Sequence, residues 1–145
     1  MKTLDQKSIV GVSALLVHAA KIDEKYSEHE KLLIKEFIKS YIKDDNCEKI
    51  LKDAEEIEKN SNQLINFTNI IKKNSTEVKS DIIEHLWKII ISDGSVDQYE
   101  SNLMRRICGL IYFSDKMCGE IKLKLMNKWL ILLKTNVLNV NLQIV

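Results

Sequence analysis

The sequence contains no proline and only four glycines in 145 residues. Because these two residues supply most tight turns, their scarcity argues against many short strands joined by hairpins. An all-α fold of one domain is therefore predicted. The apolar fraction of 45% is sufficient for a hydrophobic core, which excludes a chain that is disordered throughout.

The chain also lacks a net charge of either sign, because 22 basic and 21 acidic side chains nearly cancel. No overall field recruits nucleic acid or an acidic membrane surface, so no nucleic-acid partner is predicted. The apolar stretch 9–20 is too short to cross a membrane, and Asp5, Ser13 and His18 break the pattern of a signal peptide. We interpret this stretch as a buried helix and predict no transmembrane segment.

Cysteine is scarce as well. Cys47, Cys108 and Cys118 form no CxxC pair, and an odd number of cysteines argues against a disulfide framework, so a reduced cytoplasmic setting is predicted. The sequence contains no cluster of nitrogen and sulfur ligands with the spacing of a zinc site. No nucleophile–base motif or phosphate-binding loop is present either, and we therefore predict no enzymatic activity.

What the sequence does contain is an internal similarity at an offset of 70 residues. Asp23 falls on Asp93, and Glu30 falls on Glu100. Each acidic stretch follows an apolar segment and precedes an amphipathic one, so the chain predicts two pseudo-symmetric helix–acidic turn–helix halves, at about 9–42 and 79–112. The matching apolar faces are Leu33, Ile34, Phe37, Ile38, Tyr41 and Ile42 in the first half and Leu103, Met104, Ile107, Cys108, Ile111 and Tyr112 in the second.

Three further helices complete a compact bundle of about seven. Two lie between the halves, the first with an inner stripe of Ile50, Leu51, Ala54 and Ile57, the second with inner residues that include Leu64, Ile65 and Phe67. The third follows Ser114 or Asp115, either of which can cap it. The domain is predicted to span 1–134, and the tail 135–145 is either frayed or extended along the body.

Helix capping explains several of the acids. Ser27 and Glu30 have the S-x-x-E spacing of a capping box, and Asp97 with Glu100 is the counterpart in the second half. Asp23 and Asp93 have no such role. They follow a buried helix, where the helix dipole disfavours a carboxylate, so each requires a compensating backbone amide, lysine or cation.

A calcium EF-hand is excluded by position. Counted from Asp93, the sixth residue is Gln98 in place of glycine and the twelfth is Met104 in place of glutamate. A shorter oxygen-rich turn remains as an alternative to capping alone. If the halves pack together, the carboxylates that would surround a hard cation, Ca²⁺ or Mg²⁺, are Asp23, Glu30, Asp93, Asp97 and Glu100.

The motif D-G-x-x-D-x-x-E between a buried and an amphipathic helix, within LWKIIISDGSVDQYESNLMRRICGLIYFSD, resembles the TerB-like family. That family is named for tellurite-resistance protein B and includes the N-terminal region of some membrane-bound J-domain co-chaperones. The resemblance implies an all-helical, cytoplasmic, stress-related domain without established catalysis, whose acids are proposed to bind metal. Glu24 and Lys25 depart from the motif in the first half, where the Lys25 ammonium can replace a cation.

Two functions follow from these residues. The first is a non-enzymatic TerB-like module that binds a divalent cation through its acidic turns. The alternative is a protein-interaction module, co-chaperone-like or scaffolding, that uses the acidic face without metal for a protein partner of unknown identity. Of the histidines, only His29 lies within an acidic stretch and is a further metal candidate, whereas His18 and His85 are expected to pack in helices. The oligomeric state is left open.

Overall fold

The computed structural model describes residues 4–22, 26–43, 46–93 and 98–144, and within these ranges the chain forms helices and no strand. The prediction of an all-α fold is therefore confirmed. The elements are α1 (Gln6–Ala20), α2 (Glu28–Tyr41), α3 (Cys47–Asn60), α4 (Ile65–Ile71), α5 (Thr76–Ile90), the 3₁₀ turn η1 (Ile91–Asp93), α6 (Gln98–Leu110) and α7 (Asp115–Ile144).

Side-chain caps explain where several helices begin. Asp5 accepts a hydrogen bond from the backbone N–H of Ser8 at 2.7 Å and starts α1. Ser75 does the same for the backbone N–H of Val78 at 3.2 Å and starts α5. Ser114 accepts from the N–H of Met117 at 3.4 Å at the start of α7. The sequence therefore specifies these helix starts locally.

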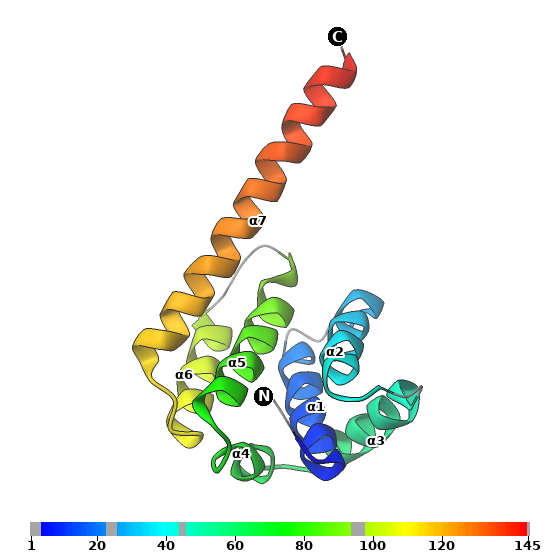
Figure 1. Ribbon diagram of the computed structural model, residues 1–145, viewed down its shortest axis with the longest axis vertical. Coiled ribbons are helices and arrows are strands. Elements are labelled where there is room, and N and C mark those ends of the chain that lie inside the picture. Colours follow the sequence, from blue (N-terminus) through cyan, green and yellow to red (C-terminus); the bar gives the residue numbers. More distant parts are fainter. Residues whose placement is uncertain (1–3, 23–25, 44–45, 94–97, 145) are drawn as a thin grey trace.

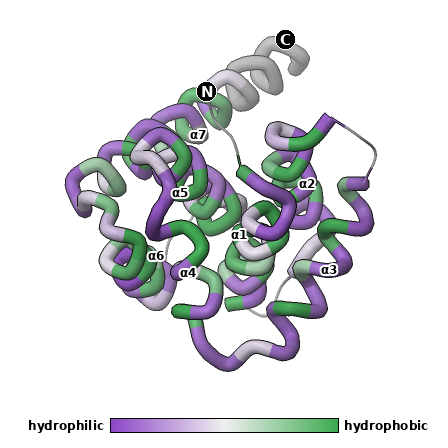
Figure 2. The backbone as a smooth tube through the Cα atoms, turned by 60° about the horizontal axis from the view of Figure 1, so that its bottom comes forward, coloured by the Kyte–Doolittle hydropathy of each residue, from purple (hydrophilic) through white to green (hydrophobic). Residues whose placement is uncertain are grey.

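Helix α1 lies at the centre of the body and contacts α2, α3, α4 and α5. Its residues are apolar nearly all round, and ten of its 15 residues are buried. Figure 2 shows the consequence, because hydrophobic residues gather around α1 and hydrophilic residues lie mainly on the outer helices. Helix α5, the other apolar segment, contacts α1 directly and carries the same number of buried residues.

The direction of these two helices sets the arrangement of the turns. Figure 1 shows α1 and α5 side by side and running in the same direction, whereas α2 and α6 run the opposite way. Helix α2 contacts α1 and α5, and α6 contacts α4 and α7. Both buried helices therefore end, and both amphipathic helices begin, at one end of the bundle, which we call the turn end. The starts of α2 and α6, which are 70 residues apart in sequence, therefore lie at this common end.

Three apolar residues expected to be buried are exposed. Ile57 in α3 and Ile65 at the start of α4 are each 44% exposed. Tyr112 is 71% exposed because α6 ends before it. Its φ of 58° is left-handed, and the N–H of Phe113 bonds to the carbonyl of Cys108 at 2.9 Å. This is a Schellman ending, in which the left-handed residue turns outward.

The chain after residue 134 also differs from expectation. It is neither frayed nor extended along the body, because α7 continues without a break to Ile144 and has 30 residues. Its first turns pack against α5 and α6. Figure 1 shows its later turns passing the turn end and projecting beyond the other helices.

Candidate functional site

The structure describes part of the acidic set predicted to bind a cation. Glu30 and Glu100 lie within it, whereas Asp23 and Asp97 fall outside the described residues. Asp93 is the last residue of η1, and its side chain is likewise outside the description. Whether the two turns share one ion depends on the distance between the carboxylates of Asp23 and Asp93. A shared ion therefore stays a prediction.

Glu30 forms the capping box that its spacing predicts. Its backbone N–H donates to the Ser27 hydroxyl at 3.2 Å, and its carboxylate accepts from the backbone N–H of Ser27 at 2.9 Å. The Ser27 hydroxyl also donates to the same carboxylate oxygen at 3.0 Å. The residue is only 5% exposed, and the positive end of α2 stabilises its charge. Glu30 thus has the capping role that its spacing predicts.

Glu100 repeats this placement in the second half. It is the third residue of α6, as Glu30 is the third of α2, and it is 7% exposed. A buried carboxylate requires compensating hydrogen bonds or charge. Its neighbour Tyr99 is 80% exposed, so α6 turns the acid inward while the preceding residue faces solvent. The two matched acids are therefore both buried at the turn end.

Two lysines lie beside Tyr26, shortly before α2 begins. The ammonium of Lys31 lies 5.0 Å from the centre of the Tyr26 ring, and that of Lys21 lies 5.9 Å from it. The Tyr26 hydroxyl is buried and has no hydrogen-bond partner in the described part of the chain. Burial, followed by the nearby carboxylates of Glu55 and Glu28, raises the pKa of Tyr26 above its usual range. The phenol consequently stays neutral.

Sequence reasoning missed Glu58, which α3 contributes to the first turn. Its carboxylate accepts a hydrogen bond from the Lys21 ammonium at 2.8 Å and lies 3.4 Å from Nδ1 of His18. Glu58 is mostly buried, with a side chain 11% exposed. The residues of this group are 37 to 40 positions apart, so no local spacing could have revealed it.

The second turn differs in sequence at each of these lysines. The first half carries Lys21, Lys25 and Lys31, and the positions 70 residues later are Ile91, Ser95 and Ser101. The acids Asp93, Asp97 and Glu100 are thus retained while the cations at matching positions are replaced by neutral residues. A carboxylate-rich turn of this kind has the oxygen donors that a hard cation such as Ca²⁺ or Mg²⁺ prefers.

A small hollow at the turn end does not provide the cation site. It has a volume of about 300 Å³ and lies between α7, the start of α2 and the end of α5. Its polar lining is His29, Lys88, Ser92 and Lys128, with apolar walls of Leu33, Ile91, Leu125 and Leu132. Two ammonium groups disfavour a metal ion there, so His29 is not placed as a ligand.

A larger hollow of about 890 Å³ lies between α1, α3 and α4, lined by the first residues of α1.

The remaining histidine and cysteine residues are packed. The Nδ1 atom of His85 lies 2.8 Å from the carbonyl oxygen of Asp81, and the ring meets Phe37 edge-on at 5.2 Å. Cys108 is fully buried, and its hydrogen bond with Cys118, with burial, raises the pKa of the Cys108 thiol. Among the described residues, no group of three or more histidine, cysteine, aspartate or glutamate side chains is arranged to hold a metal ion.

The fold and the two turns define a class of protein, an all-helical module in which paired buried helices lead into acidic turns. Within this class, residues 10–123 match the family model described as Tellurite resistance protein TerB. The match covers most of the chain, which therefore belongs to the TerB family, as the resemblance in its second acidic motif predicts. No curated protein and no solved structure matches the sequence.

Within the described ranges, no helix has both the length and the apolarity that crossing a membrane requires.

Proposed function

We propose that this protein is a non-enzymatic, cytoplasmic TerB module that binds a divalent cation, Ca²⁺ or Mg²⁺, at its second acidic turn. The family match supports the association with tellurite resistance. The observation that carries the cation is the comparison of the turns. Lys21 and Lys31 accompany the first turn, whereas the second keeps its acids and has Ile91 and Ser101 at the matching positions.

The ligands in this proposal are Asp93, Asp97 and Glu100, completed by backbone carbonyls or water. Glu100 is buried at the third position of α6, where the other two acids precede it by seven and three residues. Carboxylates in such a turn repel one another, and a bound cation relieves that repulsion. Asp23 and Glu30 are second-rank candidates, because Glu30 is engaged in a capping box and the ammonium groups of Lys21 and Lys31 lie close to Tyr26 in the first half.

The test separates capping from cation binding by using amides in place of acids. Asparagine caps a helix as well as aspartate, and glutamine can replace glutamate in a capping box. The variant Asp93→Asn/Asp97→Asn therefore keeps its cap but loses two charged ligands. Thermal melts are recorded with EDTA and with millimolar Ca²⁺ or Mg²⁺, for the wild type and for this variant.

We expect the melting temperature of the wild type to rise with the cation. At a concentration of about 100 times Kd, a specific ligand adds roughly 2.7 kcal/mol of stability. The amide variant should lose this response and melt in EDTA at or above the wild-type temperature, because a repulsive pair is gone. The matched control is Asp23→Asn, in the lysine-rich turn, which should keep the response.

Two results would contradict the cation. One is the absence of any cation-dependent shift in the wild type, and the other is an equal shift in the amide variant. Either would favour the alternative function, in which the acidic turns cap helices and dock a basic surface of a protein partner.

A further inference from the structure

Two of the three cysteines lie on either side of the turn between α6 and α7. Only four residues, 111–114, connect the two helices, which run in opposite directions and contact each other. The carbonyl oxygen of Cys108 accepts a hydrogen bond from the N–H of Phe113 at 2.9 Å. The N–H of Cys118 donates to the carbonyl oxygen of Ser114 at 3.0 Å. Backbone hydrogen bonds of the turn therefore fix the positions of both cysteines.

The side chains of these two cysteines meet in the core. The thiol of Cys108 donates a hydrogen bond to the sulfur of Cys118. Cys108 is fully buried, and Cys118 is 6% exposed. A disulfide requires its two sulfur atoms to lie about 2.05 Å apart. Because these sulfur atoms are already in hydrogen-bond contact, only a short further approach is needed to join them.

The surroundings of Cys118 favour its thiolate form. Nε1 of Trp87 donates a hydrogen bond to its Sγ at 3.3 Å, and the Lys122 ammonium lies 5.2 Å from the centre of the Trp87 ring. The hydrogen bond from Cys108, followed by the one from Trp87, lowers the pKa of the Cys118 thiol, although burial and Asp115 act in the opposite direction. The thiolate is the nucleophilic form of cysteine, so Cys118 is the more reactive member of the pair.

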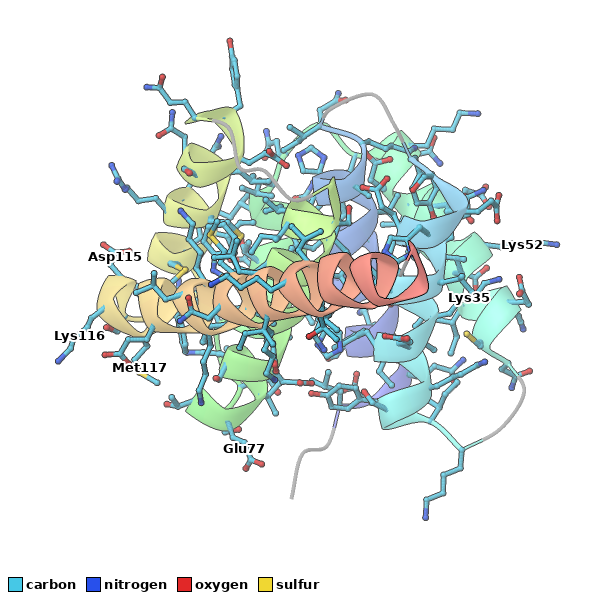
Figure 3. All side chains as sticks on the ribbon, turned by 90° about the horizontal axis from the view of Figure 1, so that it is seen from above. Lys35, Lys52, Glu77, Asp115, Lys116 and Met117 are labelled. Atoms are coloured by element: carbon cyan, nitrogen blue, oxygen red, sulfur yellow. The ribbon has the colours of Figure 1, made fainter. Side chains whose placement is uncertain are left out.

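Cys118 also lies next to the surface of the molecule. Figure 3 shows Asp115, Lys116 and Met117 at one edge, and these exposed residues form the first turn of α7. Cys118 follows them directly and turns inward to Trp87. A small oxidant that enters at this edge therefore reaches the sulfur of Cys118 before that of the fully buried Cys108.

We propose that Cys118 and Cys108 form a redox-modification site, at which a hydroperoxide converts the two thiols into a disulfide that joins α6 to α7. The Cys118 thiolate attacks one oxygen of hydrogen peroxide, so that an S–O bond forms, the O–O bond breaks and the released hydroxide takes up a proton to become water. The sulfur of Cys108 then attacks the sulfenic acid on Cys118. The Cys108 thiol proton leaves with the hydroxyl group as a second water, and two electrons have passed from the sulfur atoms to the peroxide.

The third cysteine provides a matched reference within the same chain. Cys47 in α3 is 5% exposed, close to the value for Cys118, but its thiol donates to the carbonyl oxygen of Lys35 at 3.7 Å. Burial raises the pKa of the Cys47 thiol. Two cysteines of nearly equal exposure therefore differ in their hydrogen bonds and in the direction of their pKa shifts, and oxidation should distinguish them.

A reversible disulfide fits the reduced setting that the cysteine content predicts. Disulfides in a reducing compartment are usually transient, because thiols such as glutathione reduce them again. The disulfide is expected to form when hydroperoxide is present and to be reduced afterwards. This site lies outside the acidic turns and uses neither of them, so it is independent of the proposed cation.

The experiment treats the reduced full chain with hydrogen peroxide at neutral pH, then denatures it and labels the remaining thiols with N-ethylmaleimide. The intact mass should show three labels before oxidation and one label afterwards, on Cys47, since the chain has three cysteines. Peptide mapping should find Cys108 linked to Cys118. Cys118 should lose its thiol about fivefold or more faster than Cys47, because its larger thiolate fraction outweighs the lower nucleophilicity of that thiolate. Dithiothreitol should restore all three labels.

Serine variants separate the roles of the two cysteines. Cys108→Ser should let the sulfenic acid accumulate on Cys118, where dimedone traps it, whereas Cys118→Ser should leave Cys108 reduced. The control Cys47→Ser should form the disulfide at the wild-type rate. Circular dichroism checks the folding of each variant, and if one fails to fold, the peptide map of the wild type decides alone.

Three results would overturn the proposal. The first is a chain that keeps all three thiols while the same peroxide oxidises an equal concentration of free glutathione. The second is loss of the Cys47 thiol as fast as that of Cys118. The third is a Cys108–Cys118 disulfide that forms as fast in urea as in the folded protein, because closeness in the sequence would then account for it without the folded arrangement.

Discussion

The two helix–turn–helix halves have the same arrangement of elements but differ in the charged residues beside their acidic turns. Each has a buried helix of 15 residues, an acidic turn and an amphipathic helix whose third residue is a buried glutamate. In the first half, Lys21 and Lys31 stand beside the turn, and Glu58 joins them from α3. In the second half the matching positions are neutral. The same backbone plan thus carries lysines at these positions in one copy and neutral residues in the other.

The halves differ in their apolar anchors too, and this difference predicts the largest effect. Phe37 of α2 is fully buried and packs against Tyr41 at 5.0 Å and His85 at 5.2 Å between ring centres. Its counterpart in α6 is Ile107, which is equally buried but smaller. We expect Phe37→Ala to lower the free energy of unfolding by about 3–5 kcal/mol, measured by urea denaturation.

The matched substitution Ile107→Ala should cost less, at about 2–4 kcal/mol, because a smaller cavity remains. Tyr99→Ala, at an exposed site, is the control and should lie within about 0.5 kcal/mol of the wild type. A larger loss from Ile107→Ala than from Phe37→Ala would show that the second half is the better anchored one.

Removal of a helix cap is expected to give the next largest loss of stability. Removing the hydroxyl with Ser27→Ala leaves the N–H of Glu30 without its acceptor, and we expect a loss of about 1 kcal/mol in urea denaturation. Ser27→Asn should retain most of the stability. The same pair at the second turn, Asp97→Ala and Asp97→Asn, tests whether Asp97 caps α6. Equal stability of Asp97→Ala and the wild type in EDTA would rule out that capping role.

The two halves also end in different backbone conformations, so a substitution by glycine should affect them differently. Tyr112 is left-handed with φ of 58°, whereas the matching Ile42 is extended with φ of −123°. A left-handed conformation costs a tyrosine roughly 1–2 kcal/mol and costs glycine almost nothing. Lys72 lies 4.7 Å from the centre of the exposed Tyr112 ring and offsets part of that cost.

We therefore expect opposite signs from the same substitution. Tyr112→Gly should raise the free energy of unfolding by about 0.5 kcal/mol, whereas Ile42→Gly should lower it by about 1 kcal/mol or more, since it adds backbone freedom and removes a half-buried side chain. Urea denaturation of the two variants measures both values. A loss of stability from Tyr112→Gly would mean that the contact with Lys72 outweighs the strained backbone.

Sequence periodicity and capping were sufficient to predict most of this fold. The existence of the seven helices, the burial of α1 and α5 and the Ser27–Glu30 box all depend on residues within one or two turns of each other. The exposed positions of Ile57, Ile65 and Tyr112 were not predictable in this way, because burial depends on how the other elements pack around each residue. Helix α7 beyond residue 134 was missed since asparagine, valine and threonine are weak helix formers.

The candidate site was predictable to a smaller extent. The spacing of the acids identified the two turns, and the capping role of Glu30 is confirmed. The pairing of Glu58 with Lys21 arises from packing between α1 and α3, which no local motif encodes. The participation of Asp23, Asp93 and Asp97 in cation binding stays a prediction, and the loss of matching lysines is the signal that favours the second turn.

The smallest effect concerns Tyr26, whose counterpart in the second half is Val96. Its buried hydroxyl makes no hydrogen bond with the described residues, so Tyr26→Phe should change stability at pH 7 by less than about 0.5 kcal/mol. Tyr41→Phe is the contrast, because the Tyr41 hydroxyl donates to the Asp81 carboxylate at 2.7 Å. Losing that bond should cost about 1–3 kcal/mol.

The same tyrosines make the folded state sensitive to alkali. Burial raises the pKa of both phenols in the folded protein, whereas in the unfolded chain a tyrosine ionises near pH 10. Above about pH 10 the unfolded state releases protons that the folded state retains, so stability falls as the pH rises. Melting temperatures measured from pH 8 to 11 should therefore fall less steeply for Tyr26→Phe than for the wild type. Parallel curves would mean that Tyr26 ionises in the folded protein as readily as in the unfolded chain, and that the first turn is open to solvent at high pH.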